Sequence, residues 1–166
     1  RHARKPAASL MNQSGEAVHV WVFDGQNVVS IDDMKAGEYQ LIIRLEREPP
    51  YCTGTGKAVL AALPEDTAYN LLADELKKFT ENTITDKEQL YCELVATRAR
   101  GYSIDNEERK IGIRCVGTAI RNRKSVVGAI SVTGPKHRFL QAHLPILADL
   151  VTATAAQISL SIEVDE

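Results

Sequence analysis

Residues 111–135 read IGIRCVGTAIRNRKSVVGAISVTGP, and this stretch contains two runs rich in β-branched and small apolar residues. The pattern predicts one strand over residues 113–120 and a second over residues 126–133. Asn122 supplies the turn between them, and Gly134-Pro135 is expected to end the second strand. A connection this short favours an antiparallel pair of neighbouring strands.

Three polar side chains in these strands give the first indication of function. Alternate residues of a strand face the same side, so Ser131 and Thr133 share one face. If the two strands pair across the turn, Cys115 can lie on that same face. The other interpretation is that both hydroxyls bond to backbone groups at the end of the strand.

Further strands are predicted upstream of this pair. Residues 17–23 (AVHVWVF) end at Asp24-Gly25, which is a strong hairpin signal, and residues 28–31 return as a second strand. Residues 41–45 (LIIRL) predict a third strand, and residues 102–104 predict a short one.

Helices are predicted between and after these strands, from apolar spacing and from capping residues. Their expected ranges are 56–63 stopped by Pro64, 65–76 with Tyr69, Leu72 and Leu76 on one stripe, Thr85-Asp86 to Arg100 ended by Gly101, and 144–162. The inward residues are expected to be Leu90, Leu94 and Val95 in the third helix, and Leu144, Leu147, Val151, Ala155, Ile158 and Ile162 in the last. Strands, helices, strands and a final helix predict an α+β domain with helices packed against one antiparallel sheet.

Composition narrows the class of protein. The 166 residues suffice for one domain with a real core, and 44% hydrophobic with 25% charged residues is typical of a globular chain. Twenty basic residues against 22 acidic ones leave a formal charge of -2, which argues against this chain holding DNA or RNA by itself. No apolar run approaches ~18 residues and no signal-peptide pattern opens the chain, so we expect a cytoplasmic protein without a membrane partner.

The cysteines support the same compartment. Cys52, Cys92 and Cys115 are an odd number without CxxC spacing, whereas an extracellular disulfide framework usually has an even and denser set. We therefore expect reduced thiols. The chain begins at Arg1 with a basic, small-residue stretch, which suggests a fragment of something longer.

A glycine-rich turn opens the first predicted helix. Thr53-Gly54-Thr55-Gly56-Lys57 exposes backbone N–H groups at a helix N-terminus, where an anion can bind. It is not a phosphate-binding GxxxxGK loop, because a single residue separates the glycines and Ala58 follows the lysine. A single carboxylate suits so short a turn better than a polyphosphate does. An ordinary tight turn remains the alternative.

Asp105 directly follows the short predicted strand, so within the acidic run 105–108 it is the residue best placed to point inward. The other interpretation is a solvated acidic surface.

The sequence shows none of the usual residue patterns of a catalytic or metal-binding site. None of the histidines (His2, His19, His137 and His143) stands in a triad context, and no HExxH or paired Cys–His spacing occurs. We therefore expect no catalytic residues, no metal and no cofactor. Convergence of Cys52, Asp105 and Cys115 on a soft metal stays open.

Four motifs together resemble one family. PYCTGTGKAVLAALP (50–64), FTENTITD (79–86), RARGYSIDNEERKIGIRCVGTAI (98–120) and VVGAISVTGP (126–135) resemble the ligand-binding domain of the isocitrate lyase regulator (IclR) family of bacterial transcription regulators. Each motif alone is weak, but their order and spacing make a strong match from about Glu16 to the last helix.

The resemblance implies a GAF-like or profilin-like domain, with a curved antiparallel sheet flanked by helices. It places an effector-binding domain at residues 16–166, after a linker or helix segment at residues 1–15. Family members are homodimers or dimers of dimers. They bind operator DNA through an N-terminal winged helix-turn-helix, which we expect to be absent from this chain.

The resemblance also implies the site and its ligand. Members of this type sense small organic acids, which predicts a keto, hydroxy or sugar acid held by backbone N–H groups of Gly54, Thr55 and Gly56. Ser131 and Thr133 would bond to the same carboxylate or to a neighbouring oxygen. Asp105 would accept a hydrogen bond from a ligand hydroxyl, hydrate or water, and Ile113 and Cys115 would form a less polar wall.

Several alternatives stay open beside this hypothesis. A GAF-like thiol enzyme would use Cys115 or Cys52, a GAF-type module would bind a nucleotide with help from Lys57, and a pure dimerisation domain would leave the pocket empty. In some family members the position of Thr55 holds a smaller residue, the position of Thr133 holds Ser, and the position of Glu48 holds an apolar residue. If Glu48 faces inward, it favours a ligand with more hydroxyls or with positive character; if it faces outward, the pocket is more open.

Overall fold

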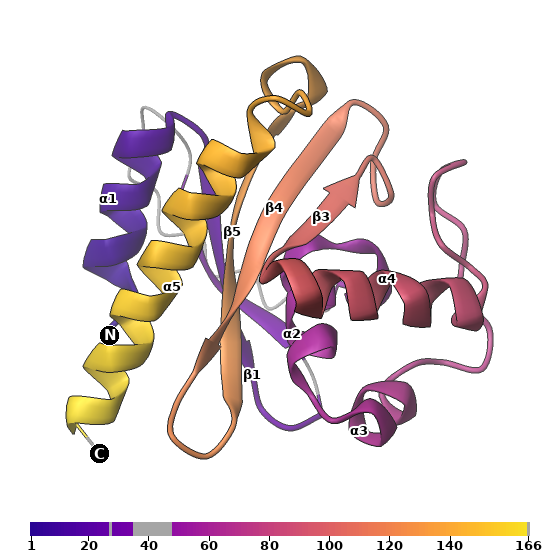
Figure 1. Ribbon diagram of the computed structural model, residues 1–166, viewed down its shortest axis with the longest axis horizontal. Helices are drawn as coiled ribbons and strands as arrows, with labels where there is room; N and C mark the ends of the chain where they lie inside the picture. The colour runs from indigo at the N-terminus through magenta and orange to yellow at the C-terminus, as the bar shows by residue number, and fades with distance from the viewer. Residues whose placement is uncertain (27, 35–47, 166) are drawn as a thin grey trace.

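A computed structural model describes residues 1–26, 28–34 and 48–165. Over these residues the strands form a five-stranded antiparallel sheet in the order β2-β1-β5-β4-β3, with helices on both faces (Figure 1). The strands are β1 (Ala17–Phe23), β2 (Val28–Met34), β3 (Ser103–Asn106), β4 (Ile113–Arg121) and β5 (Val126–Pro135). The α-helices are α1 (Arg4–Ser14), α2 (Gly54–Ala62), α3 (Glu65–Asn70), α4 (Lys87–Arg100) and α5 (Leu144–Asp165). The predicted α+β class is confirmed.

The first hairpin forms as predicted. β1 pairs with β2 on one side and with β5 on the other, so the first strand of the chain lies beside the last. A register shift between Val20 and Trp21 marks a bulge in the β1–β2 pair. The predicted strand over residues 41–45 lies outside the described residues.

The pairing of β3, β4 and β5 places the polar residues of interest together. Cys115 lies opposite Thr133 in the β4–β5 pair and opposite Asp105 in the β3–β4 pair. β5 extends two residues beyond the predicted residue 133 and ends at Pro135, so the prediction that Gly134-Pro135 ends the strand is confirmed. Proline is tolerated there because it is the last residue of the strand. Asp105 lies within β3 rather than after it.

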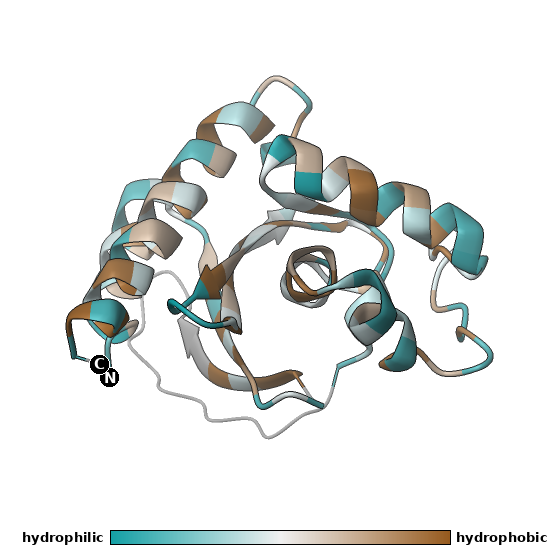
Figure 2. Cartoon of the chain, turned by 60° about the horizontal axis from the view of Figure 1, so that its bottom comes forward, coloured by the Kyte–Doolittle hydropathy of each residue, from teal (hydrophilic) through white to brown (hydrophobic). Residues whose placement is uncertain are grey.

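The sheet separates two hydrophobic cores. The first lies beneath α1 and α5 and includes the alternate residues Val18 and Val20 of β1. The second surrounds α2, which Figure 2 shows enclosed between the sheet and α4, and it includes Trp21 and Ala129. The segment 1–15 contains α1, whose Ala7, Leu10 and Met11 are part of the first core.

Capping residues explain both boundaries of α4, and packing explains the early end of α3. Asp86 accepts a hydrogen bond from the Gln89 N–H at 2.8 Å and Gly101 is left-handed, so α4 begins and ends as predicted. The helix predicted over residues 65–76 is shorter, because the chain turns after Asn70 and Leu76 then reaches the second core.

The prediction that Val95 of α4 faces inward was wrong, because this residue is 42% exposed, whereas Leu90 and Leu94 are buried as expected. Tyr69, which the sequence placed on one stripe with Leu72 and Leu76, is 59% exposed.

α5 packs its predicted face against the sheet. Five of the six residues named for that face are buried in the first core, and Ile162 packs partly buried against it. The sequence was expected to contain no apolar run of about 18 residues. Within the part of the chain that the structure describes, however, α5 has the length and apolar composition of a membrane-crossing helix. A helix that covers a sheet in a globular domain meets the same criterion.

Candidate ligand-binding site

A cavity of about 170 Å³ lies where the N-terminus of α2 meets the face of the sheet opposite α5. Seven of the eight residues predicted for the site line it: Gly54, Thr55, Asp105, Ile113, Cys115, Ser131 and Thr133. The remaining lining residues are His19, Trp21, Glu48, Thr53, Arg109 and Lys110.

Close packing between α2 and β4 positions the floor of the cavity. A Cβ atom added to Gly54 would lie 2.9 Å from the Cβ of Cys115, so only glycine allows this approach. Ser103 of β3 donates a hydrogen bond to the Gly54 carbonyl and fixes the start of the helix to the sheet. The glycine turn therefore determines how near the helix N-terminus comes to the strands.

Gly56 was predicted to bind the ligand but does not line the cavity. Its N–H donates to Oγ1 of Thr53, the N-cap of α2, at 3.1 Å. An added Cβ would lie 2.4 Å from the backbone of Pro50, so this glycine serves the packing of the helix against the preceding turn. Gly54 and Thr55 belong to the first turn, whose N–H groups lack intrahelical acceptors, and a helix N-terminus favours an anion.

The strands supply hydroxyls and a thiol to the same cavity. Ser131 is 2% exposed, and Sγ of Cys115 lies 2.9 Å from Oγ1 of Thr133. Burial, followed by the nearby Asp105 carboxylate, raises the pKa of the Cys115 thiol. Burial likewise raises the pKa of Cys52 to about 12. Both thiols are therefore protonated near neutral pH, which disfavours a thiolate nucleophile.

Asp105 is the acidic group of the cavity and is 3% exposed. Burial raises its pKa from 3.8 to about 7, against the opposing effect of the Glu108 N–H, which donates to Oδ1 at 2.8 Å. The neutral acid is thus well populated near pH 7, and it can donate a hydrogen bond. The sequence-based expectation considered only acceptance by the ionised form.

A buried ion-pair network lies behind Asp105. Lys57 is 1% exposed, and its Nζ contacts Glu108 Oε2 at 2.8 Å and Glu93 Oε1 at 3.3 Å. Arg100 contacts the same Glu93 oxygen at 2.8 Å. Because Lys57 is already paired, it is not available to bind a phosphate, which disfavours the nucleotide alternative.

Of the two orientations that the sequence left open for the Glu48 side chain, the structure shows the inward one. Its side chain lines the cavity, and its Oε2 accepts a hydrogen bond from Nε of Arg109 at 2.7 Å. The guanidinium of Arg109 also lies 4.1 Å from the centre of the Phe79 ring.

Sequence reasoning missed five other residues of the cavity. For His19 and Trp21 a signal existed, because the alternation in AVHVWVF places them on the face opposite Val18 and Val20, and His19 pairs with Ser131. Arg109 and Lys110 lie in a loop without periodicity, and Thr53 was considered only as part of the turn.

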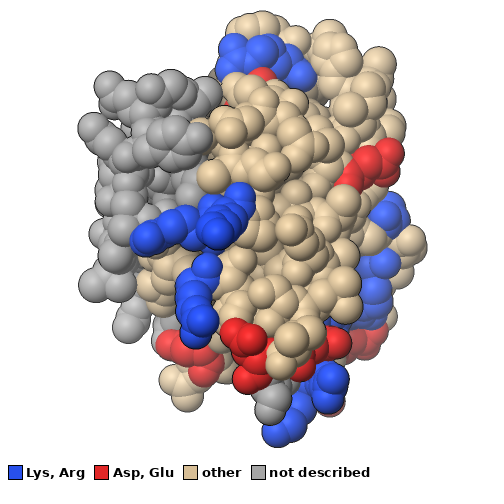
Figure 3. Space-filling view, turned by 90° about the vertical axis from the view of Figure 1, so that its left-hand side faces the viewer, with Lys and Arg blue, Asp and Glu red and all other residues tan. Residues whose placement is uncertain are grey.

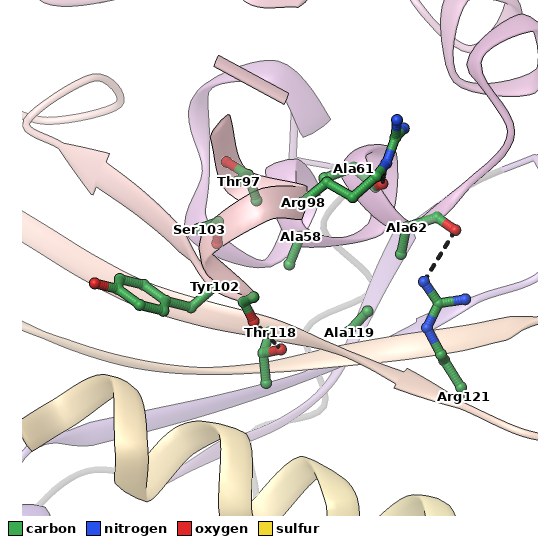
Figure 4. Close-up of a pocket in the computed structure, with 11 residues that line it drawn as sticks. Ala58, Ala61, Ala62, Thr97, Arg98, Tyr102, Ser103, Thr118, Ala119 and Arg121 are labelled. Atoms are coloured by element: carbon green, nitrogen blue, oxygen red, sulfur yellow. Dashed lines mark hydrogen bonds between the residues drawn. The ribbon is translucent and has the colours of Figure 1, made fainter. Parts of the chain in front are cut away.

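A second hollow of about 190 Å³ lies further along α2 and was not predicted (Figure 4). Small side chains such as Ala58 and Ala119 line it. Arg98 and Arg121 donate to the Ala61 and Ala62 carbonyls at its rim, at 2.8 and 3.2 Å. These arginines cap the end of α2.

Among the described residues, no three His, Cys, Asp or Glu side chains are grouped so as to hold a metal ion. Cys52, Asp105 and Cys115 therefore do not form the metal cluster that the sequence left open.

The curved antiparallel sheet flanked by helices, with a cavity on one face, defines a GAF-like domain. The chain belongs to the family described as bacterial transcriptional regulator IclR C-terminal, whose model matches residues 1–160. The resemblance seen in the sequence is confirmed.

Two curated relatives illustrate the match. The HTH-type transcriptional regulator BhcR of Paracoccus denitrificans is 35% identical over 164 residues, which cover 95% of this chain and 58% of the relative. The HTH-type transcriptional repressor AllR of Escherichia coli K12 is 34% identical over 157 residues, covering 90% of this chain and 57% of the relative. The chain thus spans less than two thirds of these relatives.

Solved structures agree. The Thermotoga maritima IclR superposes with a TM-score of 0.89 at 34% identity, covering 97% of this chain and 67% of that one. The C-terminal domain of the E. coli transcriptional regulator KdgR superposes with a TM-score of 0.86 at 30% identity, covering 98% of this chain and 96% of that domain.

Proposed function

We propose that this domain is the ligand-sensing part of a cytoplasmic bacterial transcription regulator and that its cavity binds a small organic acid. The carrying observation is that the α2 N-terminus, Asp105, Ser131 and Thr133 line one cavity although they are distant in sequence. The family and its HTH-type relatives support a role in transcription regulation, with operator DNA bound by a separate helix-turn-helix domain. The proposed role is binding, not catalysis.

The chemistry of the lining suits a carboxylate. The N–H groups of Gly54 and Thr55 and the positive end of the α2 dipole attract the anion. The hydroxyls of Ser131 and Thr133 on β5 can donate to the same carboxylate, and neutral Asp105 adds a further donor. Ile113 and Cys115 contribute less polar surface for the carbon skeleton.

The size of the cavity limits the ligand to a few carbons with their oxygens. For a ligand of about six heavy atoms, at most about 1.5 kcal/mol per atom can be gained, and ordering costs reduce this. Dissociation constants of about micromolar to millimolar follow, which suits a metabolite sensor.

The proposed mechanism is a population shift. A bound acid connects the start of α2, β3 and the end of β5, and Lys57 extends this connection to Glu93 of α4. The ligand alters DNA affinity only by its differential affinity for two arrangements of the oligomer.

Ser131→Ala should weaken binding of the acid about 5- to 150-fold, because one buried hydrogen bond worth about 1–3 kcal/mol is lost. Isothermal titration calorimetry with an acid carried through native purification, identified by mass spectrometry, measures the loss. Thr118→Ala, in the hollow of Figure 4, is the control and should bind like the parent. Equal affinities for all three proteins would show that the site is misplaced.

We also propose that two copies associate through α5. Its outer side carries apolar residues at heptad spacing, of which Ile146, Leu160 and Val164 are 64%, 63% and 84% exposed. Figure 3 shows a broad area without charged side chains on the side of the molecule formed by α1 and α5. Large exposed apolar patches mark interaction sites.

Sedimentation velocity is expected to show a dimer or larger species for the parent. Leu160→Glu should shift it toward monomer, because a charge would be buried in an apolar contact. Gln89→Glu, at an exposed position of α4 on the other face of the sheet, adds the same charge and should leave the assembly intact. A parent that sediments only as monomer would contradict this proposal.

A further inference from the structure

The cavity has a buried floor and a more exposed mouth of different chemistry. Thr55, Asp105 and Ser131 at the floor are 2–3% exposed. At the mouth, the side chains of Glu48 and Arg109 are 25% and 39% exposed and form an ion pair. A carboxylate held at the floor therefore directs the rest of the ligand toward this pair.

The pair is held in place from two sides. Nε of Arg109 donates to Glu48 at 2.7 Å, and the guanidinium stacks near the Phe79 ring. Within residues 1–26, 28–34 and 48–165, the two terminal nitrogens of Arg109 make no protein hydrogen bond. Among these residues, the terminal N–H groups of Arg109 thus remain available to donate to a ligand in the cavity. The Glu48 carboxylate beside them can accept a hydrogen bond from that ligand.

Charge decides which second group fits the mouth. Glu48 neutralises Arg109, so an apolar tail would desolvate a charged pair without compensation. A second carboxylate would gain from Arg109 but would meet the negative charge of Glu48. A neutral hydroxyl or carbonyl can accept from Arg109, and a hydroxyl can also donate to Glu48.

We propose that the Glu48–Arg109 pair selects small monocarboxylic acids with a neutral polar group, such as a hydroxyl, at the end remote from the carboxylate. This inference rests on the proposed function, because it needs the carboxylate at the floor. It narrows the ligand class to hydroxylated or carbonyl-bearing monoacids, at the expense of plain alkanoic acids and dicarboxylic acids.

Three acids that differ only at the remote end test the selection: propionate, 3-hydroxypropionate and malonate. Calorimetry should show that the parent binds 3-hydroxypropionate about three- to tenfold more tightly than the other two. Glu48→Gln keeps a hydrogen-bonding partner for Arg109 but removes the negative charge. It should raise the affinity for malonate relative to 3-hydroxypropionate about tenfold. Arg109→Gln should abolish the preference for 3-hydroxypropionate over propionate.

Glu75→Gln, an exposed carboxylate outside the cavity, makes the same charge change and should leave all ratios as in the parent. Thermal unfolding of each variant verifies that it is folded. If all three acids bind, Ser131→Ala weakens all three, and Glu48→Gln leaves their ratios unchanged, the selection is wrong while the proposed function stands. If the parent binds none of the three acids saturably, the acid site itself is contradicted, and the selection with it.

Discussion

Lys57→Met should lower the free energy of unfolding by about 3–5 kcal/mol, because it leaves the buried Glu108 carboxylate without its cation, while Glu93 keeps Arg100. Lys57 is 1% exposed and contacts Glu108 at 2.8 Å and Glu93 at 3.3 Å. It also donates to the Ile104 carbonyl of β3. The substitution keeps the aliphatic volume, so the loss measures the missing charge and hydrogen bonds rather than a cavity. Urea unfolding followed by circular dichroism gives the value.

Lys78→Met is the matched control, since Lys78 is exposed and pairs only with exposed Glu81 among the described residues. It should change the free energy of unfolding by no more than about 0.5 kcal/mol. Adding Glu108→Gln to Lys57→Met removes one uncompensated carboxylate and should recover part of the loss. A Lys57→Met variant as stable as the control would contradict the role assigned to this network.

The second large effect is a dependence of stability on pH that arises from Asp105. Its pKa is about 7 in the folded protein, against an ordinary value of 3.8 for an exposed aspartate in an unfolded chain, so the folded state binds the proton more tightly. The contribution of Asp105 to the free energy of unfolding is therefore complete below pH ~4, and it is lost as the pH rises to about 7. A difference of about three pH units corresponds to about 4 kcal/mol.

Asp105→Asn should remove this dependence, because the amide stays neutral at every pH. The stability of the Asn variant relative to the parent should rise between pH 4 and 7 and level off above pH 7. Urea unfolding at several pH values measures the difference, in which the contributions of other carboxyl groups cancel. Parallel pH profiles of the two proteins would show that Asp105 ionises normally.

The same titration affects the ligand. Neutral Asp105 donates to a bound carboxylate, whereas ionised Asp105 repels it. We expect the affinity of the parent for an organic acid to fall above pH 7 and that of Asp105→Asn to vary much less.

The floor of the cavity could be predicted from the sequence because strand periodicity fixes which side chains share a face. Ser131, Thr133 and Cys115 follow from that rule, and their predicted alignment is confirmed by the β4–β5 register. Gly54 was identified as part of a helix start. The family resemblance assigned the same residues to one site.

The mouth of the cavity could not be predicted in this way. Glu48 and Arg109 lie in irregular segments, 61 residues apart, and only the folded chain brings them together. The N–H of Gly56 was assigned to the ligand because the sequence does not reveal that the Thr53 side chain accepts it. The neutral form of Asp105 depends on its burial, which no local pattern encodes.

Binding of a small organic acid in the cavity is most directly tested by two-dimensional ¹H–¹⁵N NMR of the domain titrated separately with glycolate, pyruvate and glycerate. At least one of these acids should produce saturable shifts concentrated at the amides of Gly54, Thr55, Asp105, Ser131 and Thr133. The amides of Ala61 and Thr118, at the hollow of Figure 4, should remain unchanged. Shifts confined to that hollow, or none with any of the three acids, would contradict the account.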